Sequence, residues 1–229
     1  MCGRNSLFVP SSDLESRFDA EVIADGGYEP RYNIAPGADL EVITNDAPGA
    51  IGRYHWGLLP LWADERGEGI VNARSETVDQ KRPFEDAWDS RPCLVLSSGF
   101  YEWQARAGGP KRPYRVYRED GPTFAMAGLW DVWEGEDGPV PCVTILTTEP
   151  NELMEPIHDR MPVVLPKDAE SEWLTAGPAV REELCRPYPR DDLTAYEVST
   201  AVNDPGNDDP GVIDPLEHEQ SGLGEFTPG

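Results

Sequence analysis

Lysine is rare in this chain: only three of the 229 residues are Lys. Lys and Arg together number 19 against 43 Asp and Glu, which gives a formal net charge of −24. Such a surface repels itself in dilute buffer and stays soluble where salt screens it, so we interpret it as halophilic adaptation to a high-salt cytoplasm. Nucleic-acid-binding proteins usually carry a net basic face, so the net charge taken alone argues against a nucleic-acid partner.

The chain also lacks a long apolar run and a cysteine framework. No stretch approaches the roughly 18 residues of a membrane-spanning helix, and the N-terminus does not have the pattern of a signal peptide. We therefore expect a soluble, cytoplasmic monomer without membrane contact. Cys2, Cys93, Cys142 and Cys185 form no C-x-x-C pair and have no His at ligand spacing. This spacing argues against a metal site and disulfides, and no cofactor is predicted.

Hydrophobic residues make up 38% of the chain, which is enough for one large domain. Alternation and turn signals predict strands at 40–44, 51–59, 94–98, 113–118, 123–132, 142–148, 161–165 and 195–199. Short helices are predicted at 13–24, 83–88, 150–156 and 168–175, the first from an S-x-x-E capping box. Many strands with few short helices indicate an α+β fold with a mainly antiparallel, barrel-like sheet.

The composition changes near residue 204. From there to residue 229 the chain is rich in Asp, Gly, Pro and Glu and almost free of large apolar residues. Such segments cannot bury enough apolar surface to fold. We therefore expect a catalytic domain over residues 1–203 and an acidic, disordered tail over 204–229.

The N-terminus offers an unusual nucleophile. A small second residue normally leads to removal of the initiator methionine, which would leave Cys2 with a free α-amine beside its thiol. The amine titrates near about 8 and the thiol near about 8.5, so both nucleophiles are partly available at neutral pH. An aldehyde would be captured first as an imine and then by the thiol, closing a thiazolidine ring with the advantage of an intramolecular reaction. Against this stands the common disorder of chain termini.

Short motifs occur along the chain in a fixed order. They are Cys2-Gly3-Arg4, Tyr32-Asn33-Ile34-Ala35-Pro36, Trp56-Gly57-Leu58-Leu59-Pro60, Asn72-Ala73-Arg74, Gly99-Phe100-Tyr101-Glu102-Trp103 and His158-Asp159-Arg160-Met161-Pro162. Their order and spacing over residues 2–203 are similar to those of the SOS response-associated peptidase (SRAP) family. One departure is Leu96-Ser97-Ser98, where the family pattern has Pro-Ala and an acidic or similar residue.

The resemblance implies a DNA damage response protein that crosslinks itself to abasic sites in single-stranded DNA. The implied catalytic residues are Cys2, which supplies amine and thiol, Asn72, which holds the N-terminal residue, Glu102, which exchanges protons with the amine, and His158, which assists opening of the sugar. A carboxylate among aromatic residues tends to have a raised pKa, and histidine titrates near neutrality. The predicted DNA contacts are Arg4, Pro36, Trp56, Trp62, Arg74, Arg82, Trp103, Arg112 and Arg160. Arginine suits bidentate phosphate contacts and tryptophan suits stacking, although Trp56 could equally be a core residue.

Other functions remain open at this point. The chain could be a cysteine-type autopeptidase or a hydrolase of other proteins, with Cys2 as nucleophile and Glu102 or His158 as base. It could also be a noncovalent DNA-binding module. Lyase activity at abasic sites could accompany imine formation, because an imine acidifies the neighbouring carbon.

Overall fold

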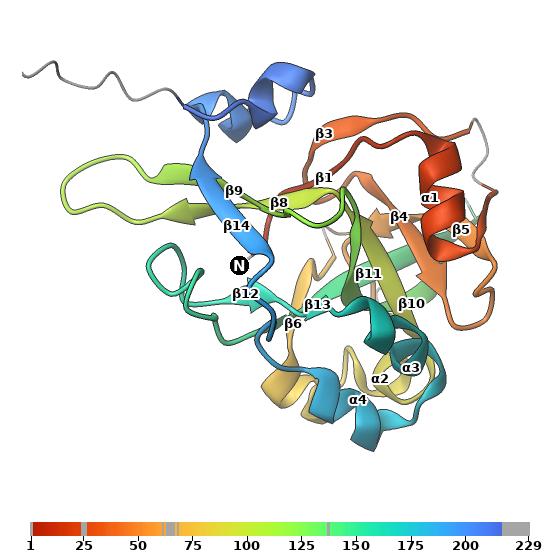
Figure 1. Ribbon diagram of the computed structural model, residues 1–229. Coiled ribbons are helices and arrows are strands. Elements are labelled where there is room, and N and C mark those ends of the chain that lie inside the picture. Colours follow the sequence, from red (N-terminus) through yellow and green to blue (C-terminus); the bar gives the residue numbers. More distant parts are fainter. Residues whose placement is uncertain are drawn as a thin grey trace, which may run out of the picture.

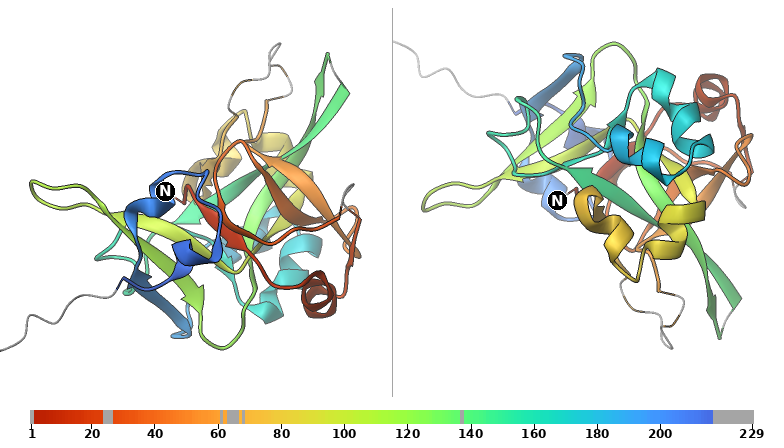
Figure 2. Two further views of the ribbon diagram at one scale, coloured as in Figure 1. Left: turned by 90° about the horizontal axis from the view of Figure 1, so that it is seen from above. Right: turned by 90° about the horizontal axis from the view of Figure 1, so that it is seen from below.

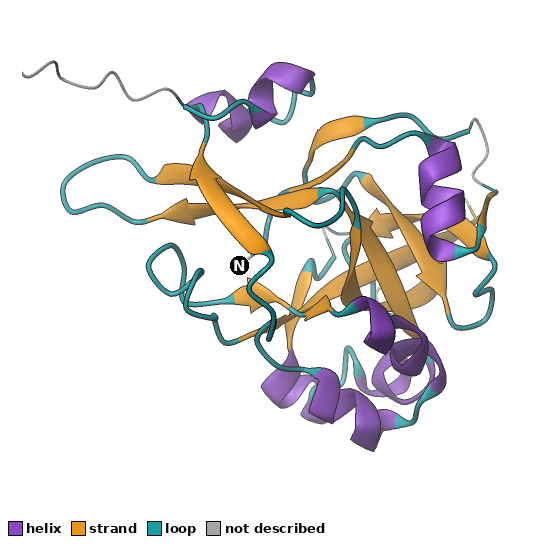
Figure 3. Cartoon of the chain, viewed as in Figure 1, coloured by secondary structure: helices purple, strands orange, loops and turns teal. Residues whose placement is uncertain are grey.

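The computed structural model describes residues 2–23, 27–60, 62, 67, 69–136 and 138–216. Within them, strands dominate and the helices are short (Figures 1 and 3). No helix of this described part is both long and apolar enough to cross a membrane.

Five strands form a closed barrel. They are β4 (Asp39–Thr44), β5 (Ala50–Trp56), β7 (Pro92–Ser97), β10 (Phe124–Gly135) and β11 (Gly138–Thr148). They pair antiparallel in the order β11-β10-β7-β4-β5, and a parallel pairing of β5 with β11 closes the ring. Their inward residues make the core, in which Val42, Val95 and Ala127 are completely buried. The predicted α+β fold with a mainly antiparallel, barrel-like sheet is confirmed.

Short strands extend this barrel sheet. β2 (Glu21–Val22) pairs with β5, and β13 (Val164–Leu165) pairs with β10. β6 (Asn72–Arg74) and β12 (Met161–Pro162) both pair with β11, and Thr147 of β11 faces a residue of each. Thr147 therefore lies between the segment that begins at Asn72 and the segment that follows His158.

A second, antiparallel sheet lies beside the barrel. Its order is β14 (Leu193–Glu197), β9 (Arg112–Arg118), β8 (Gly99–Gln104), β1 (Asn5–Leu7) and β3 (Arg31–Ile34). The N-terminal strand β1 is thus an interior strand. Because its neighbours fix its backbone, the residues just before it are placed in the middle of the molecule.

Two serines anchor β1 where the sequence departs from the family pattern. Ser97 Oγ donates to Asn5 Oδ1 at 2.7 Å, and Ser98 N donates to the carbonyl of Ser6 at 2.7 Å. Gly99 has a φ of +152°, and a side chain there would lie 2.9 Å from both the Arg115 guanidinium and the Val116 carbonyl. Ser97 and Ser98 therefore help to fix β1 against the barrel.

The helices lie on the outside of the sheets. They are α1 (Ser11–Phe18), α2 (Glu85–Ser90), α3 (Glu170–Thr175) and α4 (Pro178–Leu184), with 3₁₀ turns η1 (Ser75–Gln80), η2 (Lys167–Ala169), η3 (Thr200–Asn203) and η4 (Pro210–Ile213). The predicted capping box does not form: Pro10 occupies the N-cap without a side-chain cap. The first helix ends at Phe18 because Asp19 is left-handed, with a φ of 52°. The helix predicted at 150–156 is a series of turns instead, in which Asn151 Oδ1 accepts from Met154 N.

The disordered tail predicted from residue 204 is wrong for residues 204–216. Asp208 accepts hydrogen bonds from the backbone amides of Tyr32 at 2.5 Å and Asn33 at 2.8 Å, and it pairs with Arg31. Val212 is 2% exposed, although few apolar residues surround it in the sequence. Figure 2 shows this C-terminal segment, in blue, beside the N-terminal strand. Residues 217–229 of the predicted tail lie outside the described residues.

We predict that Asp208→Ala destabilises the protein by about 1–3 kcal/mol, because it leaves two partly buried amides and a guanidinium without their acceptor. Asp209→Ala is the matched control, since the Asp209 side chain accepts only from Gly211 N in an exposed turn. Urea unfolding at fixed salt measures both. Equal midpoints for the two variants would contradict an anchored C-terminal segment.

Candidate active site

Cys2 is buried just before β1. Its exposed fraction is 0%, and its carbonyl accepts a hydrogen bond of 2.8 Å from Asn72 Nδ2. Asn72 Oδ1 is also buried and accepts no hydrogen bond within the described part of the chain. The site thus holds residue 2 in place and keeps an amide oxygen available for a donor.

Glu102 is the buried carboxylate of the site. It lies in β8 opposite Tyr114 and is 1% exposed. Burial raises its pKa, and the nearby His158 opposes that rise. The pKa of the Cys2 thiol is raised as well, first by burial and then by the charge of Glu102. The carboxylate and the thiol are therefore close enough to influence each other's protonation.

His158 completes the group from the loop before β12. Its Nε2 lies 4.0 Å from Glu102 Oε2. Its Nδ1 accepts from the backbone amide of Arg160 at 3.0 Å and lies 2.9 Å from Asp159 Oδ1. Its Nε2 faces Glu102 at a separation longer than a direct hydrogen bond. The structure thus brings all four predicted catalytic residues close to one another.

Arg4 connects this site to the C-terminal segment. Its Nη1 donates to Asn33 Oδ1 at 2.8 Å and to the Val202 carbonyl at 2.7 Å. Its guanidinium also lies 5.6 Å from the ring centre of Trp103. Arg4 is 9% exposed and bound to protein groups, so it has a structural role, and its role as a DNA contact stays a prediction.

Comparison with known proteins agrees with this geometry. Residues 1–205 match the family described as SOS response associated peptidase (SRAP). The chain belongs to the SRAP family. It is 40% identical over 222 residues to the abasic site processing protein YoqW of Bacillus subtilis, covering 93% of this chain and 99% of that protein. It is 31% identical over 264 residues to the abasic site processing protein HMCES of Gallus gallus, covering 95% and 78%.

A solved structure shows the same fold. A protein from Bacteroides thetaiotaomicron superposes with a TM-score of 0.85 at 25% identity, covering 94% of this chain and 100% of that one. The predicted resemblance to the SRAP family is therefore confirmed over the whole domain.

The tryptophans predicted as DNA contacts differ in how far the fold of this SRAP chain exposes their rings. Trp56 is fully buried, and its Nε1 donates to the Val71 carbonyl at 3.0 Å, so the prediction of base stacking is wrong for Trp56. Trp62 is 47% exposed, with the Arg82 guanidinium 4.5 Å from its ring centre. Trp103 is half-buried, and its Nε1 donates to Asn203 Oδ1 at 2.7 Å. Trp62 with Arg82 remains the best-placed aromatic and cationic pair.

The arginines predicted as DNA contacts differ in their exposure and in their ion pairs. Arg74 is exposed at the end of β6, as is Pro36 after β3. Arg112 pairs with Glu197 at 3.5 Å. Arg160 donates to both oxygens of Glu76, at 2.6 and 2.8 Å, and to the Thr147 carbonyl at 2.6 Å. A phosphate could reach Arg160 only in competition with Glu76.

Two residues that organise the site were not predicted. Asn33 lies in one of the sequence motifs, but nothing local shows that its amide bonds to residues 202–207. Glu76 follows Asn72-Ala73-Arg74. A carboxylate at this position does not indicate from the sequence that it pairs with Arg160, which lies 84 positions away. Both depend on long-range pairings that only the fold establishes. Among the described residues, no group of His, Cys, Asp and Glu is arranged to hold a metal.

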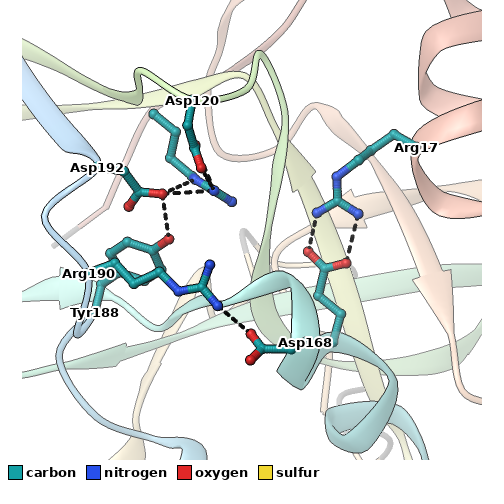
Figure 4. Close-up of polar contacts among 8 residues, drawn as sticks. Arg17, Asp120, Asp168, Tyr188, Arg190 and Asp192 are labelled. Carbon is teal, nitrogen blue, oxygen red and sulfur yellow. Dashed lines mark hydrogen bonds and ion pairs between the residues drawn. The ribbon is translucent and has the colours of Figure 1, made fainter.

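Several of the other described cations are neutralised by neighbouring carboxylates. Arg118 pairs with Asp120 at 2.7 Å and Asp192 at 2.8 Å, Arg17 pairs with Glu170, and Arg190 pairs with Asp168 (Figure 4). The exposed cations without an ion pair in the described part are Arg74, Lys81, Arg82, Arg106, Lys111, Lys167 and Arg186.

We predict that Glu102→Gln raises the stability of the protein at neutral pH. Burial raises the pKa of Glu102, so its carboxyl favours folding while protonated and opposes folding once ionised. The advantage of the variant should therefore vanish as the pH falls below the ordinary carboxyl range and grow as it rises through the raised pKa. Each kcal/mol corresponds to about 2–4 °C in Tm.

Thermal unfolding of the wild type and Glu102→Gln across this pH range measures the effect. Glu155→Gln, at an exposed position, controls for the loss of one negative charge. A Glu102→Gln variant that is less stable than wild type at neutral pH would contradict the burial argument.

Proposed function

We propose that this chain processes abasic sites in single-stranded DNA by bonding covalently to them through Cys2. The observation that carries the proposal is the placement of Cys2, which is fully buried and held by Asn72 within the electrostatic reach of Glu102. Relatives named abasic site processing proteins support the substrate. An abasic deoxyribose opens to an aldehyde, which is the electrophile that an N-terminal aminothiol captures.

The reaction begins once Met1 has been removed, by the chain itself or by an aminopeptidase. The α-amine of Cys2 adds to the aldehyde carbon and the resulting carbinolamine loses one water, which leaves an imine. The thiol sulfur then adds to the same carbon while its proton passes to the imine nitrogen. The product is a thiazolidine, whose mass equals protein plus DNA less one water.

Glu102 and His158 suit the proton transfers of this sequence. The raised pKa of Glu102 brings the carboxyl closer to neutral pH, where it can accept a proton from the amine and return it to the leaving hydroxyl. His158 Nε2 lies 4.0 Å from this carboxyl and can protonate the ring oxygen of the closed sugar. The unpartnered Asn72 Oδ1 can accept from the amine that Met1 removal exposes.

The distribution of positive charge supports DNA as the partner. Among the cations without an ion pair, Arg74, Lys81 and Arg82 follow one another along β6 and η1, beyond Asn72. The Arg82 guanidinium lies over the exposed Trp62 ring. An aromatic ring beside a cation is suited to stacking with unpaired bases. The acidic surface therefore disfavours DNA binding at positions away from the site.

A peptidase acting on other proteins is the alternative, and the state of Cys2 weighs against it. Cysteine nucleophiles work as thiolates in surroundings that lower the thiol pKa. Burial and Glu102 raise the pKa of Cys2 instead. Addition to an imine is less demanding, because the electrophile is activated and held beside the sulfur. Self-removal of Met1 and lyase activity remain compatible with the proposal as accompanying steps.

We predict a stable adduct when the purified protein is mixed, at high salt, with single-stranded DNA carrying one abasic site. Intact mass before and after mixing should show loss of Met1 and then a gain equal to the DNA less one water. Cys2→Ala should abolish the adduct, whereas Cys185→Ala, which removes a half-buried cysteine elsewhere, should not.

DNA carrying a tetrahydrofuran in place of the abasic sugar has no aldehyde and should form no adduct with any of these proteins. A protein that lacks Met1 and forms no adduct with abasic DNA would refute the crosslinking proposal. Cleavage of added peptides by the same sample, lost in Cys2→Ala, would favour the peptidase.

A further inference from the structure

The β8–β9 hairpin is the one long positive segment of this acidic chain. From Trp103 to Arg118 there are five cations, at 106, 111, 112, 115 and 118, and no Asp or Glu. The hairpin carries Glu102 at its base and extends beyond the body of the molecule, at the left of Figure 1. Its tip, residues 105–111, is exposed throughout.

Three of these cations serve the fold. Arg112 pairs with Glu197, and Arg118 pairs with Asp120 and Asp192. Arg115 is 4% exposed. Arg106 and Lys111 are exposed and have no ion pair within the described residues, so their charges are available to a partner.

A surface pocket of about 530 Å³ lies between the hairpin and the turns before His158. Its apolar walls include Trp103, Pro150, Pro156 and Ile157, and Lys111 lies at its edge. A hydrogen bond of 2.7 Å from Gln104 Nε2 to the Pro156 carbonyl holds the two walls together. His158 lines the pocket as well, so the pocket borders the candidate site through this residue.

We propose that this pocket binds the nucleotide next to the abasic site, with its base against the apolar walls and its phosphate on Lys111 and Arg106. The proposal rests on the function proposed above. Glu155 and Asp159 line the side of the pocket that the turns provide, and their negative charge repels a phosphate there. Their carboxylate oxygens can instead accept a hydrogen bond from the exocyclic amino group of a base. The phosphate must therefore lie on the hairpin side. The hairpin thus contacts the strand on one side of the lesion, and Arg74, Lys81 and Arg82 contact it elsewhere.

The test uses the full chain and a fluorescent single-stranded oligonucleotide with a central tetrahydrofuran, which binds but cannot react. The variant is Arg106→Ala/Lys111→Ala. Its matched control is Lys167→Ala/Arg186→Ala, which removes the same charge at two exposed positions outside the hairpin and the pocket. We expect weaker binding by the hairpin variant only, with a log–log salt dependence shallower by about 0.7, as the loss of one single-strand phosphate contact requires.

Oligonucleotides truncated on one side of the tetrahydrofuran identify the strand direction. Loss of the flank that occupies the pocket should weaken binding by wild type more than binding by the hairpin variant, which keeps only the apolar walls. Loss of the other flank should weaken both proteins equally. The proposal is overturned if the hairpin variant binds as the control does, or if both truncations affect it as they affect wild type.

Crosslinking to abasic DNA separates this proposal from the function on which it rests. The hairpin variant should crosslink more slowly than the control at low DNA concentration and at the same rate at saturation, because neither residue touches the reacting atoms. Wild type that binds the tetrahydrofuran strand through the hairpin yet forms no abasic adduct would refute the crosslinking function and leave the pocket assignment standing.

Discussion

The hydrogen bonds of the Arg4 guanidinium hold the first residues of the chain in the interior. They join β1 to Asn33 and to the carbonyl of Val202, and the C-terminal segment in turn binds β3 through Asp208. Chain termini usually fray, and a frayed Cys2 would share no pocket with Glu102. The buried network around Arg4 therefore turns a terminal residue into a fixed one, and the rest of the site depends on it.

Burial of the site sets its chemistry as well as its geometry. Removing Glu102 and the Cys2 thiol from water raises the pKa of both, which favours their neutral forms. A site of this kind suits stepwise proton transfers during capture of an aldehyde better than attack by a preformed thiolate. The same burial leaves DNA only the outer rim for contact. On a chain with a net charge of −24, Arg74, Arg82, Arg106 and Lys111 supply exposed cations without an ion pair on the segments that flank the site.

The five barrel strands could be predicted from the sequence, because alternation is a local signal, and the ordered motifs indicated the residues that the fold brings together at the candidate site. The errors concern residues whose role depends on distant partners. Trp56 lies within a motif and resembles a ligand contact, yet the fold buries it. Residues 204–216 have the composition of a tail, but Asp208 and Val212 gain their stability from β3 and neighbouring elements rather than from local apolar content. The turns at 150–156 replace a helix that short-range patterning favoured.

The central claim is that the reactive group is the aminothiol of residue 2, and its most direct test is the position of the bond. Trypsin digestion of the DNA adduct, followed by nuclease treatment and tandem mass spectrometry, isolates the tripeptide Cys2-Gly3-Arg4. The account predicts that the sugar remnant lies on this tripeptide and that it joins both the amine and the sulfur of Cys2. A remnant on a lysine, or on Cys93, Cys142 or Cys185, would contradict it.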